Sequence, residues 1–459
     1  SPLQFNSCHD FPLVQYADDT LILLQADARQ LVFLKAILNT FDDATGLKVN
    51  YSKSIMISIN TPAHKMAELS TLIGCKIGSL PHTYLGLPLR LNKPRIEDFI
   101  PMLKRIETRL LSCSTMLSTG DKLTLLKSVF TSLPTFIMCT LEVPRVVIKQ
   151  INTYLMDCFW RKFGTRERGM VNISWDVVCK DKDQVELGVL DLNVHNQALL
   201  IKFLHKFFNK HDVPWVSLIW DSYYDNIVPQ ATVLTGSFWW RDVFKLNDTY
   251  RAIASVHINM GDTALFWHDA WHVAGSSLPL VRRLPRLFSF VIDDKVSVRD
   301  VLQTQDLFSM FYLPISQEAA AELTILEGWL LNLQRDPLLP DQWVWPSKSG
   351  SFSAKGFYTI MHSHMPTIMP CKWLWKSRCT MKIKVFGWLL FFDRLKTKDM
   401  LVRRHWRSAN DDNLCVICNA YVHEDRAHLF FQCNFRCRVW NYLQIDWTQG
   451  SDIQQCIFH

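Results

Sequence analysis

A group of cysteine and histidine residues near the C-terminal end is the feature that most limits how this chain can fold. A Cys-x-x-Cys pair begins the group, and further cysteines and histidines follow closely: Cys415, Cys418, His423, His428, Cys433 and Cys437. Zn²⁺ takes four nitrogen or sulfur ligands in a tetrahedron, and a two-residue gap lets both thiolates of one turn reach the same ion. The pattern therefore predicts a small domain held by zinc.

Three ligand sets compete, and all of them contain Cys415 and Cys418. The second pair is His428 with Cys433, or His423 with His428, or a pair in which Cys437 replaces Cys433. A set of four protein ligands leaves no open coordination position, so the ion is expected to be structural rather than catalytic. In the alternative interpretation these cysteines and histidines are buried or incidental residues that bind no metal.

Two adjacent carboxylates lie near the other end of the chain. Asp18 and Asp19 follow Tyr16-Ala17 and separate the apolar runs 11–15 and 20–24, a pattern that predicts a hairpin with an acidic turn. Mg²⁺ prefers oxygen ligands and bridges to substrate phosphates, so such a pair suits phosphoryl transfer. The alternative is a plain Asp-Asp turn without metal.

Together with its flanks, this hairpin resembles the palm hairpin of reverse transcriptases. The segments YADDTLIL (16–23), FDDATGLKVNYSKS (41–54) and YLGLPL (84–89) are similar, in order and separation, to reverse transcriptases of non-LTR retrotransposons, especially plant long interspersed elements. The resemblance continues more weakly through 120–129, 196–203 and 266–271, and is strong again at 350–358. It implies RNA-directed DNA synthesis, with RNA and DNA as partners.

The resemblance also implies roles for individual residues. Asp18 and Asp19 become catalytic ligands of Mg²⁺, and Tyr16 lies near the primer end. Lys53 lies near the incoming nucleotide, and Tyr84 and Gly86 belong to the primer-grip region. For Lys53 the ordinary alternative is a solvated turn lysine, and for 84–89 it is a tight hairpin.

One part of the family pattern is missing from the chain. Family members carry a third metal-binding carboxylate on an earlier strand and fingers segments upstream of it, and this sequence begins downstream of both. We therefore expect a C-terminal portion of a reverse transcriptase that is inactive alone and pairs with the missing N-terminal portion. The alternative is a non-enzymatic nucleic-acid-binding protein, or an inert retrotransposon remnant, that uses only the zinc domain.

The same resemblance chooses among the zinc ligand sets. Retrotransposon polyproteins of this kind end in a reverse-transcriptase zinc-binding domain with the signature Cys-x-x-Cys, a short loop, His-Leu-Phe-Phe and Cys. The segments CVIC and HLFFQC fit this signature. The resemblance thus implies Cys415, Cys418, His428 and Cys433 as the Zn²⁺ ligands.

A basic stretch precedes the zinc ligands. The chain carries 50 Lys and Arg against 43 Asp and Glu, a net charge of +7, yet residues 372–407 alone contain 11 basic and 2 acidic side chains. Basic groups contact phosphates and exposed aromatic rings stack bases, although aromatic residues at helical spacing more often form a core. The predicted nucleic-acid-binding residues are Lys382, Lys384, Arg394, Lys396, Lys398, Arg403 and Arg404.

Other classes of protein are excluded by the sequence. It contains neither GxGxxG nor GxxxxGK[ST], which argues against a nucleotide-cradling loop. It contains no apolar run of about 18–20 residues, so we expect no membrane partner. The thirteen cysteines are an odd number and mostly lie singly, which favours the nucleus or cytoplasm over secretion.

The predicted fold is an α+β multidomain protein. We expect a partial reverse-transcriptase palm sheet at 1–92, with a helix over 28–44 that Gly46 ends and strand character over 47–59. A helical thumb-like region follows at 93–210, including helices at 150–163 and 192–208. The remaining parts are a mixed connector of unknown fold at 211–345, a small helical zinc-binding domain at 346–445 and a tail at 446–459.

Overall fold

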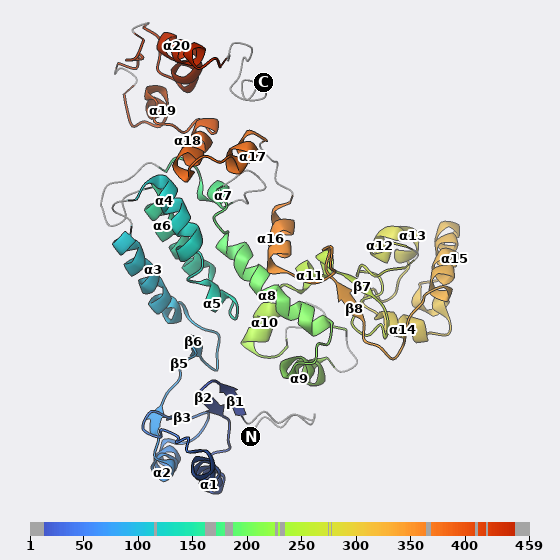
Figure 1. Ribbon diagram of the computed structural model, residues 1–459. Coiled ribbons are helices and arrows are strands. Elements are labelled where there is room, and N and C mark those ends of the chain that lie inside the picture. Colours follow the sequence, from blue (N-terminus) through green and yellow to red (C-terminus); the bar gives the residue numbers. More distant parts are fainter. Residues whose placement is uncertain are drawn as a thin grey trace. The chain divides into compact units, whose positions relative to one another are not determined.

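The computed structural model describes most of the chain (Figure 1). The described residues are 13–113, 117–160, 171–179, 187–224, 228–229, 235–273, 275–276, 278–363, 369–408, 412–418 and 421–445. The predicted tail at 446–459 lies outside them. The chain divides into two compact units, Ser1–Asp98 with Leu200–Ser353 and Phe99–Leu199 with Ala354–His459, and each is described by itself.

The first part of the first unit is built from three pairs of short strands and two helices. Its elements are β1 (Leu13–Tyr16), β2 (Asp19–Ile22), α1 (Ala28–Thr45), β3 (Ile55–Ile57), α2 (Ala63–Ile73), β4 (Lys76–Gly78), β5 (His82–Tyr84) and β6 (Leu87–Leu89). β1–β2 and β5–β6 are antiparallel hairpins, whereas β3 and β4 are parallel and joined by α2. Among the described residues these strands form three separate two-stranded sheets.

Helix α1 follows its sequence pattern closely. Asp27 caps its start by accepting a hydrogen bond from the Arg29 N–H, and Gly46 ends it with φ of 75° while its N–H donates to the Asp42 carbonyl. Leu31 packs with residues of α2 in a small core, but Phe41 on the same face is 49% exposed. The helix is therefore anchored by its first turns.

The rest of the first unit has an aromatic core that periodicity did not predict. Its elements are α9 (Pro214–Tyr223), α10 (Phe238–Phe244), α11 (Asn247–Ile253), β7 (Ser255–His257), α12 (Leu280–Arg283), α13 (Pro285–Phe288), α14 (Val298–Gln303), η4 (Leu307–Met310), α15 (Gln317–Leu331) and β8 (Gln342–Val344). β7 pairs with the distant β8. The fully buried tryptophans of this core are Trp240, Trp267, Trp271, Trp343 and Trp345.

Two buried carboxylates organise the loops around this core. Asp341 accepts hydrogen bonds from the backbone N–H groups of Asn259, Gly261 and Thr263. Asp269 forms an ion pair with the Arg251 guanidinium, and both side chains are buried. The carboxylate in the FWHDAW segment is therefore structural, because buried charges are stable only when paired and hydrogen-bonded.

The second unit is mainly helical. Its elements are α3 (Ile100–Cys113), which η1 (Ile96–Phe99) precedes, α4 (Thr119–Leu125), η2 (Leu126–Phe130), α5 (Thr135–Met138), α6 (Arg145–Trp160), α7 (Trp175–Val178), the start of α8 (Leu192–Phe208), α16 (Ala354–His362), α17 (Met369–Lys376), α18 (Met381–Phe391), α19 (Lys398–Arg403), η5 (His428–Gln432) and α20 (Asn434–Tyr442). Helices α3 and α4 both pack on α6 (Figure 1). The helical character predicted over 93–210 is thus observed in the described parts.

Helix α18 belongs to the core of these earlier helices although it follows them by more than two hundred residues. Val385 and Trp388 are buried in the same apolar cluster as Ile151 and Leu155 of α6. Gly120 of α4 makes the approach possible, because a Cβ there would lie 2.7 Å from the Lys382 backbone nitrogen. Residues 99–199 and the start of the basic stretch therefore share one core.

The predicted α+β class is confirmed, and the domain boundaries stay a prediction. Of the described helices, none combines the length and apolar character needed to cross a membrane.

Trp388 tests whether α18 is an integral part of the second unit. Trp388→Ala removes a fully buried indole and is expected to lower the free energy of unfolding by about 3–5 kcal/mol. Ile383→Ala on the same helix removes a side chain that is 53% exposed, and its effect is expected to stay below about 1 kcal/mol. Urea unfolding followed by circular dichroism measures both, and equal effects of the two substitutions would contradict the shared core.

Candidate metal centre

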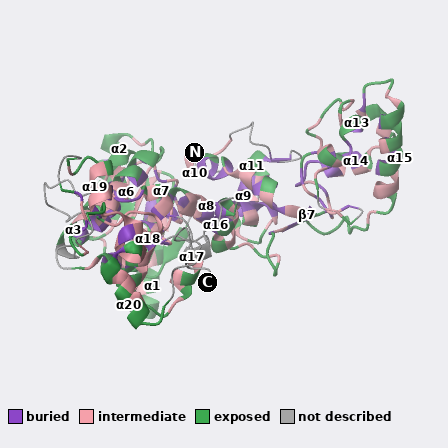
Figure 2. Ribbon diagram, turned by 90° about the horizontal axis from the view of Figure 1, so that it is seen from above, coloured by how far each residue is buried: buried purple, intermediate pink, exposed green. Residues whose placement is uncertain are grey.

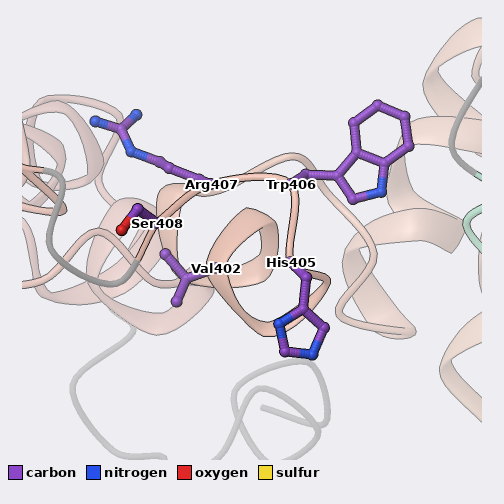
Figure 3. A pocket seen from close by; sticks show the side chains of 5 residues that line it. All are labelled: Val402, His405, Trp406, Arg407 and Ser408. Carbon is purple, nitrogen blue, oxygen red and sulfur yellow. The ribbon is translucent and has the colours of Figure 1, made fainter.

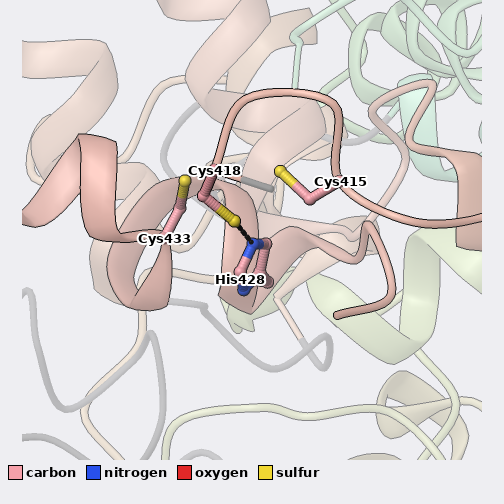
Figure 4. Close-up of side chains that lie close together, drawn as sticks. All are labelled: Cys415, Cys418, His428 and Cys433. Carbon is pink, nitrogen blue, oxygen red and sulfur yellow. Dashed lines mark hydrogen bonds between the residues drawn. The ribbon is translucent and has the colours of Figure 1, made fainter. Parts of the chain in front are cut away.

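The segment after α19 brings together two cysteines from a loop and a histidine and a cysteine from a helical turn (Figure 4). The ligand atoms of Cys415, Cys418, His428 and Cys433 all lie within 4.8 Å of one another. Sγ of Cys418 is 3.2 Å from Nε2 of His428. In the described part of the chain, no other group of three or more Cys, His, Asp or Glu residues has the geometry to hold a metal ion.

A short antiparallel contact positions the first two cysteines. Leu414 and His423 form a β-bridge, and the Cys415 N–H donates to the Val422 carbonyl at 2.8 Å. The turn that begins after Cys415 carries Cys418 back toward it. The backbone of this hairpin thus fixes Cys415 directly, while Cys418 depends on the turn.

A π-helical turn positions the other two ligands. His428 begins η5, and the Cys433 N–H donates to the His428 carbonyl at 2.8 Å. Because a π turn closes after five residues rather than four, Cys433 returns to the side of the helix that carries His428. The Asp425 carboxylate holds the start of this turn by accepting a hydrogen bond from the His428 N–H at 2.7 Å.

Cys433 also lies at the N-terminal cap of α20, which favours its thiolate. Burial by itself would raise the pKa of the Cys433 thiol. Hydrogen bonds from the backbone N–H groups of Arg436 and Phe435, and from the thiols of Cys418 and Cys415, outweigh burial and lower the pKa below its usual value. Zinc binds cysteine as the thiolate, so this environment suits a metal ligand.

The two other candidate ligands lie outside the cluster. The His423 side chain is exposed, although its backbone helps to form the hairpin. The Cys437 thiol donates to the Phe431 carbonyl at 3.1 Å. The geometry therefore selects one of the three sets that the spacing allowed, three sulfur atoms and one nitrogen, and these fit the tetrahedral preference of Zn²⁺.

The segment that carries the cluster has almost no apolar core of its own. Among its described residues from 404 to 445, the buried side chains are Asn413, Cys415, His428 and Cys433. Helix α20 has no buried residue, and Figure 2 shows much of it as exposed. Small domains without a sufficient core need disulfides or metals, so this segment is one that a metal bound by the cluster would stabilise.

Hydrogen bonds connect the cluster to the helices before it, and sequence patterns did not indicate them. The Arg426 guanidinium donates to the carbonyls of Leu390 and Phe391 at the end of α18. The Glu424 carbonyl and carboxylate accept from the N–H groups of Asp399 and Lys398 at the start of α19. The residues just before His428 are thus joined to the end of α18 and the start of α19.

The basic residues that precede the cluster fall into two groups. Lys384 and Lys398 donate to the carbonyls of Trp375 and Leu414. Arg394 donates to the Asp393 carbonyl, and Arg404 to the Asn172 carbonyl.

Arg403, although exposed, pairs with Asp393 and Asp399, and hydrogen bonds with Asp393 raise its pKa. Only Lys382 and Lys396, of the seven predicted contacts, are exposed with no ion pair or hydrogen bond recorded among the described residues.

The acidic hairpin at the N-terminal end forms as predicted. Tyr16 pairs with Asp19, and Ala17 at the turn has φ of 52°. Asp18 and Asp19 are both exposed, and Tyr16 is 65% exposed. No third carboxylate in the described part of the chain joins them in a metal-binding group, so the structure gives no support to a Mg²⁺ site here.

The other residues of the predicted polymerase site lie on separate turns. Lys53 is exposed in the turn before β3, where its N–H donates to the Asn50 carbonyl. Tyr84 pairs with Leu87 across a two-residue hairpin turn, and Gly86 in this turn has φ of 79°. Gly86 is thus required by the turn itself, whether or not nucleic acid approaches it.

Comparisons with known proteins agree with the C-terminal site. Residues 352–440 match the family described as zinc-binding in reverse transcriptase, and this range contains all four clustered residues. The match confirms the resemblance to a reverse-transcriptase zinc-binding domain that the CVIC and HLFFQC segments indicated.

The chain is also similar to a longer plant protein. It is 23% identical over 374 residues to a protein of Arabidopsis thaliana named "Putative ribonuclease H protein". The similar region is 77% of this chain and 56% of that protein, so the chain spans about half the length of this relative.

Substitutions of single ligands test the assignment of the cluster. Cys433→Ser and His428→Ala are expected to abolish stoichiometric zinc, because three remaining ligands no longer close the tetrahedron. His423→Ala and Cys437→Ser, the matched controls, are expected to retain one zinc ion per chain. Elemental mass spectrometry of the purified variants measures this, and loss of zinc from a control variant would overturn the ligand set.

Proposed function

We propose that the C-terminal part of this protein is a zinc-stabilised nucleic-acid-binding domain of a retrotransposon protein of the reverse-transcriptase kind. The observation that carries the proposal is the Cys₃His cluster within residues that match the family zinc-binding in reverse transcriptase. Cys415, Cys418, His428 and Cys433 would hold one Zn²⁺ ion, which would supply a structural cross-link. The ion would have no open position for substrate.

The charge of the preceding helices supports nucleic acid as the ligand. Residues 372–407 contain 11 basic and 2 acidic side chains. Lys382 at the start of α18 and Lys396 before α19 are both exposed, so both ammonium groups are accessible to phosphates. The remaining basic residues add positive potential while their hydrogen bonds hold the fold. Phosphate contacts of this kind are insensitive to sequence.

For the N-terminal part we propose descent from the palm of a non-LTR retrotransposon reverse transcriptase. The order of the segments 16–23, 41–54 and 84–89 supports this proposal, as does the acidic turn of the β1–β2 hairpin. In a complete enzyme, Asp18 and Asp19 would bind Mg²⁺, and Tyr16, Lys53, Tyr84 and Gly86 would lie near primer and nucleotide. The chain alone supplies two of the three carboxylates that the family uses, so we propose that it does not polymerise alone.

The alternative is a non-enzymatic nucleic-acid-binding protein. One observation favours it. Among the described residues, the Cys₃His cluster is the one group whose ligand atoms lie close enough together to bind a metal ion. Both proposals share the zinc domain and differ in whether the N-terminal part completes a polymerase with a further polypeptide.

Nucleic-acid binding is expected to depend steeply on salt. The slope of log affinity against log salt concentration should become shallower by about 2 in the Lys382→Ala/Lys396→Ala variant. Each lysine is expected to neutralise one phosphate, so the double substitution removes two such contacts. Lys348→Ala, an exposed lysine outside the basic stretch, serves as the control and should leave the slope unchanged. Fluorescence anisotropy with labelled DNA and RNA over a salt series provides the measurement. Affinity independent of salt would refute the proposal.

Primer extension separates the two proposals. The chain alone should incorporate no nucleotide on an RNA template with a DNA primer and Mg²⁺. Addition of a polypeptide that carries the upstream palm and fingers of a related reverse transcriptase should restore incorporation, and Asp18→Asn should then abolish it. If nucleotide incorporation is restored and persists in the Asp18→Asn variant, this hairpin has no role in polymerisation.

A further inference from the structure

An exposed tryptophan lies three residues after α19, within the basic stretch and before the metal-binding loop. Trp406 is 55% exposed, whereas Trp388 of α18 is fully buried. Aromatic rings that are exposed within a positively charged region offer faces on which bases stack. Trp406 is thus an aromatic side chain within the basic stretch whose ring is accessible to a ligand.

The surface around Trp406 is hollowed. Val402, His405, Trp406, Arg407 and Ser408 line an open hollow of about 450 Å³ (Figure 3). The Trp406 indole and the Arg407 guanidinium extend in opposite directions from the loop that follows α19. The hollow thus offers a flat apolar ring on one side and a cation on the other.

The backbone holds this loop in a defined conformation. His405 has φ of 57°, and its N–H donates to the Val402 carbonyl at 2.9 Å. The Trp406 N–H donates to the Leu401 carbonyl at 2.9 Å, and the Arg407 guanidinium donates to the Asp412 carbonyl at 2.7 Å. These bonds end the helix and fix the backbone at Trp406, so less backbone freedom is lost when a ligand stacks on its ring.

We propose that this hollow binds an unpaired nucleobase of single-stranded nucleic acid, stacked on Trp406. An indole face stacks on any base, and Arg407 in the hollow and the exposed Arg404 carry positive charge for the flanking phosphates, each donating to a backbone carbonyl. Bases in a duplex are already stacked on their neighbours, so their faces are not accessible to the Trp406 ring. This inference rests on the proposed nucleic-acid-binding function and deepens it, because it names single strands as the preferred ligand.

The test compares single-stranded and duplex ligands at one salt concentration. The full chain with zinc is titrated into fluorescein-labelled oligothymidylate and, separately, into a labelled duplex. Trp406→Ala should weaken binding of the single strand on the order of 5- to 100-fold and leave duplex binding unchanged. Trp406→Phe keeps an aromatic face and should retain most of the affinity. Trp373→Ala removes another exposed tryptophan, 46% exposed in α17, and should change neither affinity.

The outcomes separate this inference from the proposed function. Failure of the unsubstituted chain to bind either ligand would refute nucleic-acid binding altogether. If the unsubstituted chain binds nucleic acid and Trp406→Ala does not weaken this binding, the stacking site is refuted and the proposed function is not. The same result is expected if the hollow binds a protein segment. Equal losses for single strand and duplex would likewise overturn it. Because Trp406→Ala removes no charge, its salt dependence should match that of the unsubstituted chain.

Discussion

The closure of four side chains into one Cys₃His cluster is the constraint on which the C-terminal part of the molecule depends. Between residues 404 and 445, the described buried side chains are the three cluster residues Cys415, His428 and Cys433, together with Asn413. Ordering a chain segment costs about 1–2 kcal/mol per residue in backbone entropy, and the described residues of this segment form almost no apolar core to offset that cost. A bound metal ion offsets it, since binding free energy becomes folding free energy when the site exists only in the folded state.

The influence of the cluster extends inward through specific hydrogen bonds. Arg426 connects the turn before His428 to the end of α18, and Glu424 connects the hairpin to the start of α19. Trp388 then anchors α18 in the core formed with α6. The backbone of α18 and of the start of α19 therefore contacts residues next to the cluster, and α18 also packs in an apolar core.

Local patterns predicted part of this arrangement, and distant contacts account for the rest. Gly46 and the apolar spacing before it defined α1, and the Cys-x-x-Cys pair defined the metal-binding loop. The choice of Cys433 over Cys437 depends on a π-helical turn that no spacing rule indicates. The aromatic core of 235–345 joins β7 to a far β8, and tryptophans without periodicity cannot reveal such a pairing. Likewise, Lys384 and Lys398 were predicted as nucleic-acid contacts, and no local pattern indicated that both donate to backbone carbonyls.

The coordination of the metal tests the central claim most directly. X-ray absorption spectroscopy at the zinc edge of the purified full chain reports the type and distance of each ligand. Three sulfur atoms at about 2.3 Å and one nitrogen atom at about 2.0 Å are predicted, from Cys415, Cys418, Cys433 and His428. Two sulfur and two nitrogen atoms, four sulfur atoms, or a shell dominated by oxygen would contradict the cluster described here.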